Sequence, residues 1–221
     1  MLNSFDNYIF DLDGTLVNSS EEVLLCLHKA FMQANYKIEK SRFTSDVIGP
    51  PIRQIITALA PELEDEAIIT TIIKNFRHIY DYDENDISIL YDGIYDFVQS
   101  LKKENKKLFI ATFKPQIPTI RLIKKFFPDT FDDIYTIDKF GKSITKEEMI
   151  KDIVSKYKLE KNKTVMIGDA ASDVIAGKNA GVHTIGVLWG YGSNKDKLIE
   201  NSDKIINTLN LNATKEFQII E

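Results

Sequence analysis

Short apolar segments alternate with longer helical patterns along most of the chain. Four of these segments are rich in β-branched or aromatic residues and are bounded by turn residues: positions 7–10, 108–112, 164–167 and 183–189. Each has the length and composition of a strand. Because strands that alternate with helices build βαβ units, this order predicts an α/β fold around a parallel sheet.

An insertion separates the first two predicted strands, since about a hundred residues lie between them, far more than one crossover helix requires. Ser19 and Glu22 have the spacing of a capping box where the first helix of this stretch begins. The spacing of apolar residues predicts helices at about 20–35, 52–60 and 65–80.

The chain of 221 residues is long enough for a core domain that carries a smaller one. We expect the core at residues 1–17 and 91–221 and a mostly helical subdomain at residues 18–90. With 43% hydrophobic and 28% charged residues, the composition is that of an ordinary globular protein and excludes a disordered chain.

Charge and targeting signals limit the partners that we expect. The net charge is −5 and the lysines are scattered among the acids, which disfavours a nucleic acid polymer or an anionic membrane as a partner. No apolar run approaches the roughly 18 residues of a membrane span, and the start of the chain lacks a basic leader. Cys26 is the single cysteine and excludes an intrachain disulfide. We expect a cytoplasmic protein that acts on a small molecule, a monomer by default with a dimer as the alternative.

Two carboxylates stand two residues apart directly after the first predicted strand, in the segment Asp11-Leu12-Asp13-Gly14-Thr15. The period of a strand turns both to the same side, where their repulsion is relieved by a divalent cation or by a shared proton. Thr15 can donate a hydrogen bond back to the carboxylates. Taken alone, this pair is equally well read as a polar strand end before a turn.

A second pair of acids follows the strand at 164–167, with Asp169 directly after it and Asp173 one helical turn later. Because the carboxyl ends of parallel strands lie along one edge, both pairs are expected at one crevice. Asp169 on its own could be no more than a helix N-cap. Together, four carboxylates form a hard-oxygen site suited to Mg²⁺, whose expected ligands are Asp11, Asp13, Asp169 and Asp173.

Hydroxyl and cationic side chains stand where they could bind an anion over this metal. Thr112 ends the strand at 108–112 and can donate to an oxyanion. Lys142 and Lys146 are alternative phosphate clamps; Lys146 begins a helical pattern, whereas Lys142 lies in a predicted loop. Arg53 follows the turn at 49–51 and either meets a second anionic group of a substrate or lies on the surface.

The segments DLDGTL, IATFK, the stretch around Lys146 and GDAASD resemble, in this order, the four motifs of the haloacid dehalogenase superfamily. The resemblance implies a Rossmann-like core with a helical cap inserted after the first motif. It also implies that Asp11 is the nucleophile, that Asp13 is the general acid and base, and that Thr112 and Lys146 bind the phosphoryl group.

By the same resemblance, Asp169 binds magnesium, Asp13 binds it through its backbone carbonyl, and Asp173 acts through water. The expected activity is Mg²⁺-dependent hydrolysis of small phosphomonoesters through an aspartyl phosphate. The segments IGPP and GVLWGYGS further resemble the phosphoglycolate phosphatase-like subfamily, which includes 5′-nucleotidases.

Alternatives to this activity stay open to different degrees. A 5′-nucleotidase acting on nucleoside monophosphates and a sugar phosphomutase both share the motifs. A dehalogenase is disfavoured because it has no need of the second acid, Asp13. A phospho-acceptor signalling module also groups acids, a threonine and a lysine at a sheet edge, but such modules are half this length and carry no helical insert.

Overall fold

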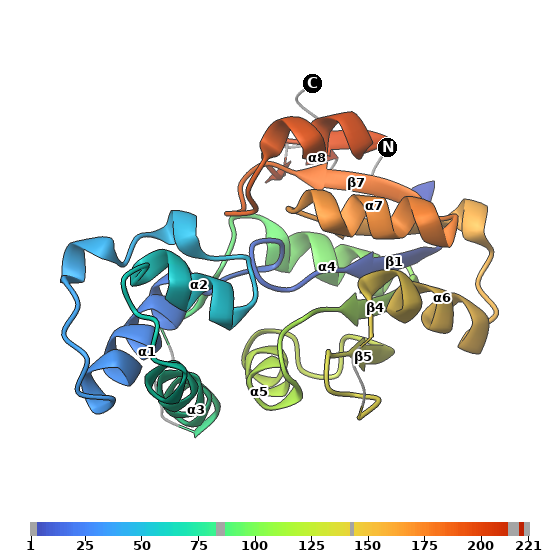
Figure 1. Ribbon diagram of the computed structural model, residues 1–221. Coiled ribbons are helices and arrows are strands. Elements are labelled where there is room, and N and C mark those ends of the chain that lie inside the picture. Colours follow the sequence, from blue (N-terminus) through green and yellow to red (C-terminus); the bar gives the residue numbers. More distant parts are fainter. Residues whose placement is uncertain (1–3, 83–86, 142–143, 212–216, 219–221) are drawn as a thin grey trace. The chain divides into compact units, whose positions relative to one another are not determined.

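The computed structural model describes residues 4–82, 87–141, 144–211 and 217–218, and six strands of this part of the chain form one parallel sheet (Figure 1). Their order is β5-β4-β1-β6-β7-β8. The α/β fold predicted from the sequence is therefore confirmed. The strands are β1 (Asn7–Phe10), β4 (Lys107–Ala111), β5 (Asp133–Tyr135), β6 (Thr164–Gly168), β7 (His183–Val187) and β8 (Lys204–Ile206).

Helices cover both faces of this sheet. The helices of this part of the chain are α4 (Ile94–Lys103), α5 (Gln116–Phe126), α6 (Lys146–Lys156), α7 (Ala171–Ala180) and α8 (Lys195–Asn201), with a short 3₁₀ turn η4 (Lys161–Lys163). An antiparallel pair, β9 (Asn210–Leu211) and β10 (Phe217–Gln218), follows near the C-terminus.

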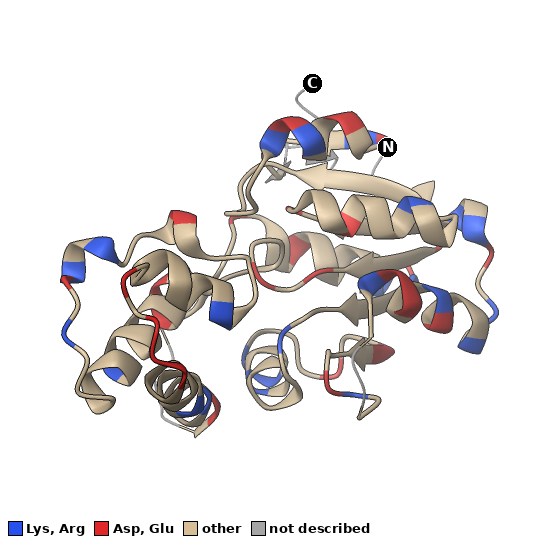
Figure 2. Ribbon diagram, viewed as in Figure 1, with Lys and Arg blue, Asp and Glu red and all other residues tan. Residues whose placement is uncertain are grey.

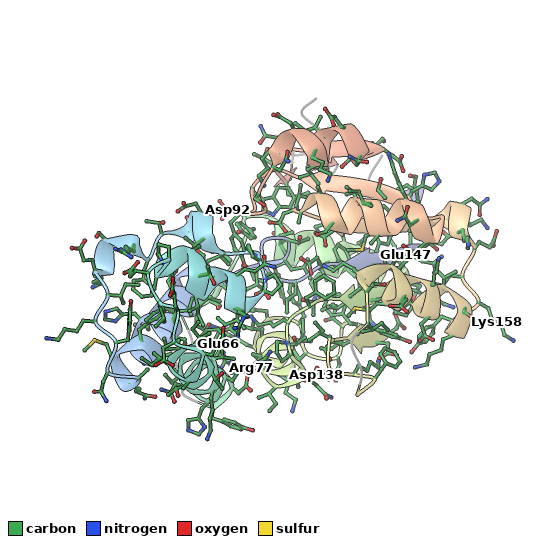
Figure 3. All side chains as sticks on the ribbon, viewed as in Figure 1. Glu66, Arg77, Asp92, Asp138, Glu147 and Lys158 are labelled. Carbon is green, nitrogen blue, oxygen red and sulfur yellow. The ribbon has the colours of Figure 1, made fainter. Side chains whose placement is uncertain are left out.

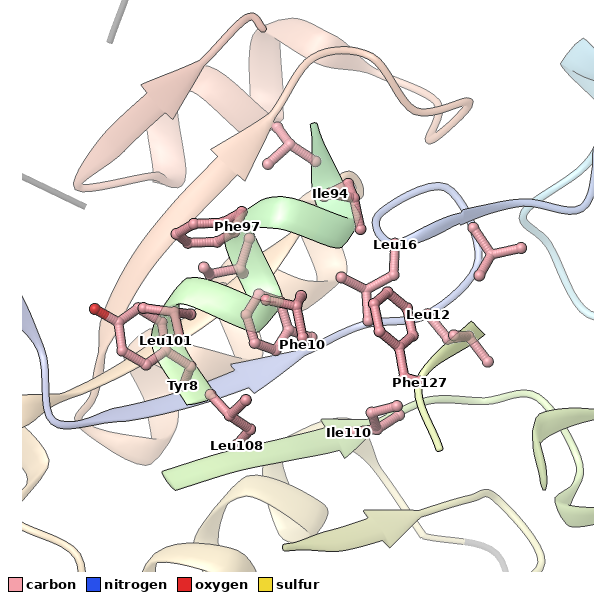
Figure 4. Packing of buried hydrophobic residues seen from close by; sticks show 14 of the residues in the cluster. Tyr8, Phe10, Leu12, Leu16, Ile94, Phe97, Leu101, Leu108, Ile110 and Phe127 are labelled. Atoms are coloured by element: carbon pink, nitrogen blue, oxygen red, sulfur yellow. The ribbon is translucent and has the colours of Figure 1, made fainter. Parts of the chain in front are cut away.

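Alternation of side chains along β1 divides the core into two layers. Tyr8 and Phe10 face α4, where each makes an edge contact with Phe97, with ring centroids 6.3 and 6.2 Å apart (Figure 4). Ile9 belongs to the opposite layer, which includes buried residues of α6 and α7. Each such side chain contributes roughly 1.5–3 kcal/mol by its burial. Because β1 is covered on both faces, apolar side chains are favoured at its successive positions Tyr8, Ile9 and Phe10.

The predicted strands are present with shifts of one or two residues at their ends. The last of them is shorter than expected, because β7 ends at Val187 and leaves Trp189 in the following loop. From that loop, Trp189 contacts the segment that follows β1.

Contacts within the chain divide it into a core unit, Met1–Asn18 with Leu90–Glu221, and an insert unit, Ser19–Ile89. The chain leaves and re-enters the core unit through two short strands that pair with each other, β2 (Val17–Asn18) and β3 (Ile89–Leu90). The insert unit is helical, with α1 (Ser20–Gln33), η2 (Lys40–Arg42), η3 (Ser45–Val47), α2 (Ile52–Leu59) and α3 (Glu66–Tyr82). It has a hydrophobic core of its own, to which α1, α2 and α3 all contribute.

The capping box predicted for α1 is wrong. Ser19 is the N-cap residue but makes no side-chain capping bond. Glu22 is buried and accepts a hydrogen bond from the Ser88 hydroxyl instead. Glu22 and Ser88 are both buried, so this hydrogen bond satisfies two polar groups that are shielded from water. Within the described ranges, no helix has the length and apolar character needed to cross a bilayer.

Candidate active site

The order of the strands brings the predicted motifs to one edge of the sheet. β1 lies between β4 and β6. The strands β4 and β5 are added on one side of β1 and the strands β6, β7 and β8 on the other, so the order of strands switches sides at β1. Asp11 follows β1, Thr112 follows β4 and Asp169 follows β6, each directly after its strand. Open α/β sheets bind ligands at such a switch point, beyond the carboxyl ends of the strands.

Three of the predicted acids meet there. In the described part of the chain, carboxylate oxygens of Asp11, Asp169 and Asp173 all lie within 4.8 Å of one another, and all three residues are buried. Asp173 lies in the first turn of α7 and accepts a hydrogen bond from the backbone N–H of Ala170, 3.1 Å away. We refer to Asp11, Asp169 and Asp173 as the acid cluster.

Lys146 is the first residue of α6, and its side chain contacts two members of the acid cluster. Figure 2 shows how the acidic and basic residues are distributed over the ribbon. Its Nζ lies 2.9 Å from Asp11 Oδ1 and 2.5 Å from Asp173 Oδ1. A capping box formed by Thr145 and Glu148 starts the helix here, which fixes where the lysine side chain begins. The ammonium group is thus held between two carboxylates in a site almost closed to water.

Burial and mutual repulsion raise the pKa values of two acids of the cluster. Burial, together with the carboxylates of Asp173 and Asp169, raises the pKa of Asp11 above its usual range, although Lys146 opposes the rise. Burial and Asp173 likewise raise the pKa of Asp169 to about 6. Burial alone would lower the pKa of Lys146, but the neighbouring carboxylates outweigh it and raise that pKa.

The donor set fits a divalent cation. The four acids predicted as metal ligands carry four negative charges when ionised, whereas the ammonium groups in contact with them, of Lys114 and Lys146, carry two. Carboxylate oxygens are the ligands that Mg²⁺ prefers, and two uncompensated charges match its own. The residues present therefore suit a magnesium ion.

Asp169 is held from two sides. Its Oδ2 accepts the backbone N–H of Gly192 at 2.7 Å and its Oδ1 accepts the Thr15 hydroxyl at 3.2 Å. A Cβ at Gly14 would overlap the Asp169 carboxylate, and one at Gly190 would overlap both that carboxylate and the Gly14 carbonyl. Thr15 was expected to bond the carboxylate of Asp11 or Asp13, but its hydroxyl donates to Asp169, which follows β6.

Trp189 fixes the loop that carries Asp13 and Thr15. Its Nε1–H donates to the Thr15 carbonyl over 3.0 Å, and its ring lies beside Tyr91, with centroids 6.3 Å apart. The loop after β7 therefore contributes to the site through Trp189, Gly190 and Gly192. The sequence motifs contain no signal for this role other than the two closely spaced glycines.

Asp13 does not join the acid cluster through its side chain. Its carboxylate oxygens lie 2.9 and 3.2 Å from Lys114 Nζ, in an ion pair separate from that of Lys146. The backbone N–H of Lys114 donates to the Thr112 hydroxyl over 3.1 Å. Lys114 ends the segment IATFK, two residues after Thr112, and nothing in the spacing indicates which acid it meets.

Two further residues, Arg53 and Lys142, were predicted as possible anion-binding groups. Arg53 lies on α2 and pairs with Glu66 of α3, both of them exposed and within the insert unit (Glu66 is labelled in Figure 3). Lys142, the alternative phosphate clamp, lies outside the described residues.

Known proteins share the sequence and the fold of this chain. Residues 8–187 match the family described as haloacid dehalogenase-like hydrolase. Pyrophosphatase PpaX of Listeria monocytogenes serotype 4a (strain HCC23) is 30% identical over 195 residues, which cover 86% of this chain and 86% of that protein. The crystal structure of a predicted phosphatase from Clostridium acetobutylicum is 27% identical, with a TM-score of 0.76 over 92% of this chain and 94% of that one. A predicted phosphoglycolate phosphatase from Haemophilus somnus 129pt shares the fold, with a TM-score of 0.80 at 22% identity over 91% of this chain and 93% of that one.

Proposed function

The chain belongs to the haloacid dehalogenase-like hydrolases, as its four motifs predicted, and from this we propose that it is a magnesium-dependent phosphatase of small phosphomonoesters. The observation that carries the proposal is the buried Asp11 carboxylate beyond β1, with Lys146 Nζ 2.9 Å away. A carboxylate beside a cation that can bind a phosphoryl oxygen is the arrangement that nucleophilic attack on phosphorus requires.

In the first half of the reaction, a carboxylate oxygen of Asp11 attacks phosphorus in line with the leaving ester oxygen. The ester P–O bond breaks as the aspartyl phosphate forms, and the leaving oxygen takes a proton from the Asp13 carboxyl group. In the second half, the Asp13 carboxylate takes a proton from water, which attacks the same phosphorus. Inorganic phosphate leaves and Asp11 is restored.

Thr112 and Lys146 bind the phosphoryl oxygens in both halves. The Thr112 hydroxyl accepts from a backbone N–H, so its own hydrogen is available to a phosphoryl oxygen. The Lys146 ammonium has three donors, of which two serve Asp11 and Asp173, and it can direct the third at the phosphoryl group.

Magnesium would be held by the carboxylates of Asp11 and Asp169 and by the backbone carbonyl of Asp13, with Asp173 acting through water. The bound ion supplies positive charge that offsets the acids and the phosphoryl oxygens. The raised pKa values of Asp11 and Asp169 support this, because burial and the repulsion of neighbouring carboxylates disfavour their ionised forms, which a bound cation would stabilise.

Small anionic phosphomonoesters are the substrate class that we propose, with 2-phosphoglycolate as the first candidate. Nucleoside monophosphates and hexose phosphates, the latter including a mutase reaction, are the alternatives. Pyrophosphate is a second candidate because PpaX of Listeria monocytogenes is 30% identical over most of both chains. Arg53 would bind a second anionic group only by exchanging its present partner, Glu66.

The substitution Asp11→Asn tests the proposal, because it removes the nucleophile and keeps the shape of the side chain. We expect turnover of p-nitrophenyl phosphate with Mg²⁺ to fall at least about 1,000-fold, since the covalent step is lost. Circular dichroism and thermal melting should show a folded protein. Asp6→Asn, at an exposed acid in the core unit, is the matched control and should retain activity. Retention of most activity by Asp11→Asn would show that the nucleophile is another residue.

A panel of 2-phosphoglycolate, pyrophosphate, nucleoside monophosphates and hexose phosphates then separates the substrate classes. One ester that is turned over at least tenfold faster than the rest would identify the class. We also expect the enzyme to be cytoplasmic and monomeric. Sedimentation of the purified chain tests whether it is a monomer.

A further inference from the structure

We infer that Lys114 is a positioning residue, whose ammonium group holds the Asp13 carboxyl group in the orientation from which it exchanges protons with the leaving oxygen and with water. The inference rests on the proposed function. It gives a role to a lysine to which the motifs assign none, and it explains why a cation is buried beside the acid that moves protons.

The geometry of the pair is specific. Lys114 Nζ reaches both carboxylate oxygens of Asp13, at 2.9 and 3.2 Å. The lysine side chain is only 3% exposed, whereas that of Asp13 is 25% exposed. The ammonium group thus approaches from the protein interior and leaves an open side of the carboxyl group for a reacting oxygen. Each carboxylate oxygen has two lone pairs, so a bond to Lys114 does not consume the capacity of Asp13 to carry a proton.

The backbone around Lys114 is fixed on both sides. Its N–H donates to the Thr112 hydroxyl at 3.1 Å, which joins it directly to a proposed phosphoryl ligand. The first N–H of α5, at Gln116, donates to the Asp138 carboxylate at 3.0 and 3.2 Å (Asp138 is labelled in Figure 3). Thr119 donates to the carbonyl of Pro115 at 2.7 Å. A lysine that starts from so rigid a loop can hold its partner in one orientation.

Burial of the lysine argues against a surface ion pair of little consequence. Lys139 and Asp133 form a structural ion pair elsewhere in the core unit, 2.6 Å apart, and the lysine side chain there is 27% exposed. Lys114 gives up nearly all its hydration to contact Asp13, a cost that a flexible surface lysine avoids. The two pairs therefore offer a comparison between a positioning lysine and a structural one.

Loss of this orientation should matter most when the leaving oxygen needs a proton. Phenyl phosphate and p-nitrophenyl phosphate have nearly the same size, but p-nitrophenolate is a much weaker base and leaves without protonation. In kcat/KM, which reports the steps up to the first release of product, Lys114→Met should lose at least about 30-fold for phenyl phosphate, because placed proton donors typically contribute this much or more. For p-nitrophenyl phosphate we expect a loss below about threefold.

Lys139→Met is the matched control, since it also removes a lysine from an ion pair with an aspartate. It should change kcat/KM for the two esters by the same small factor. Lys114→Arg, which keeps the charge, should recover most of the activity on phenyl phosphate. If Lys114→Met fails to fold, Lys114→Gln carries the same comparison, because it removes the ammonium group and shortens the side chain but leaves a polar group in the buried position.

A double-mutant cycle gives an independent readout. In an Asp13→Asn background, Lys114→Met should cost less than about a further twofold on phenyl phosphate, because the group that it positions is already disabled. Additive losses, or equal losses of Lys114→Met on both esters, would overturn the inference and leave the proposed function standing. If the wild-type protein with Mg²⁺ hydrolyses neither ester, the proposed function fails and the inference fails with it.

Discussion

Lys146 Nζ lies 2.9 Å from Asp11 Oδ1, so the first residue of α6 neutralises the carboxylate at the end of β1. The contact joins two segments that are 135 positions apart in the sequence. Because the lysine also meets Asp173, one ammonium group stands between two acids of the cluster. Any change at this lysine should therefore alter both the chemistry and the stability of the site.

Replacement of Lys146 by alanine should abolish most activity and destabilise the fold. Breaking a buried ion pair from one side costs roughly 3–5 kcal/mol, because a charge is left uncompensated. We expect kcat to fall at least about 100-fold, since a ligand of the phosphoryl group is lost. Lys142→Ala is the matched variant and should have nearly wild-type activity and melting temperature. The reverse ranking in a phosphatase assay would make Lys142 the phosphate-binding residue.

Magnesium should raise the melting temperature of the protein. An ion at about 100 times its Kd stabilises the folded state by about 2.7 kcal/mol, or roughly 5–10 °C for a chain of this size. Asp169→Asn should lose most of this shift. Without metal, the same variant should be at least as stable as the wild type, because burial raises the pKa of Asp169 and its ionised form opposes folding at neutral pH. Melting curves in EDTA and in Mg²⁺ measure both effects, and an undiminished shift in Asp169→Asn would exclude it as a ligand.

Gly190→Ala, in the loop after β7, should displace the Asp169 carboxylate of the acid cluster. The new Cβ would overlap the Gly14 carbonyl and the Asp169 carboxylate, so the loop has to move, at a cost of about 2–3 kcal/mol. A carboxylate displaced by about 1 Å reduces activity by roughly 100-fold.

Gly181→Ala, at the C-terminal end of α7, provides the control for this substitution. Its Cβ would meet only the flexible end of Lys161, the nearest atom being 3.3 Å away. Because this position has a positive φ of 82°, we expect Gly181→Ala to lower the free energy of unfolding by about 1 kcal/mol. Its activity should be that of the wild type. Similar melting temperatures and activities for the two variants would contradict the steric argument.

Acid should remove a stabilising contribution of Asp133. Burial by itself would raise the pKa of this carboxyl, but hydrogen bonds from Lys139, Lys156 and Tyr157 outweigh it and lower the pKa to about 2. A pKa depressed in the folded state contributes stability that is complete above about pH 4 and is lost as the pH falls towards about 2. The melting temperature of the wild type should thus exceed that of Asp133→Asn at pH 7, and the gap should narrow below about pH 4.

Exposed Glu200 supplies a control for that pH series, because Glu200→Gln removes a carboxylate that forms no ion pair with the residues that the structure describes. It should differ little from the wild type at any pH. A gap between Asp133→Asn and the wild type that persists unchanged at pH 3 would mean that the ion pairs of Asp133 do not stabilise the fold.

Much of the fold could be predicted because hydrophobic spacing is a strong local signal. Tyr8, Ile9 and Phe10 are apolar at successive positions, as expected of a strand that is buried on both faces. The acids after two such strands could be placed at one edge by topology alone. Lys146 could be placed at a helix start because a helical pattern begins there; the capping box of Thr145 and Glu148 is what fixes that start in the structure.

Other features depend on tertiary contacts that local patterns do not encode. Ser19 and Glu22 have the spacing of a capping box, yet Glu22 bonds Ser88 from the far end of the insert unit. Lys114 could not be matched to Asp13, because the pairing depends on how the loop before α5 is held. The glycines after β7 predict only a turn. The structure shows that Gly190 is needed because a Cβ there would overlap the Asp169 carboxylate.

The paired strands β2 and β3 have a consequence for how such a protein can diversify. They bring the chain back beside the point at which it left the sheet, so the ends of residues 19–89 lie next to each other. The residues proposed to attack phosphorus, transfer protons, bind the phosphoryl group or hold the metal all lie in the core unit: Asp11, Asp13, Thr112, Lys146 and Asp169. In evolution or in the laboratory, a foreign segment of different length can therefore be exchanged at this junction without rebuilding the reaction centre.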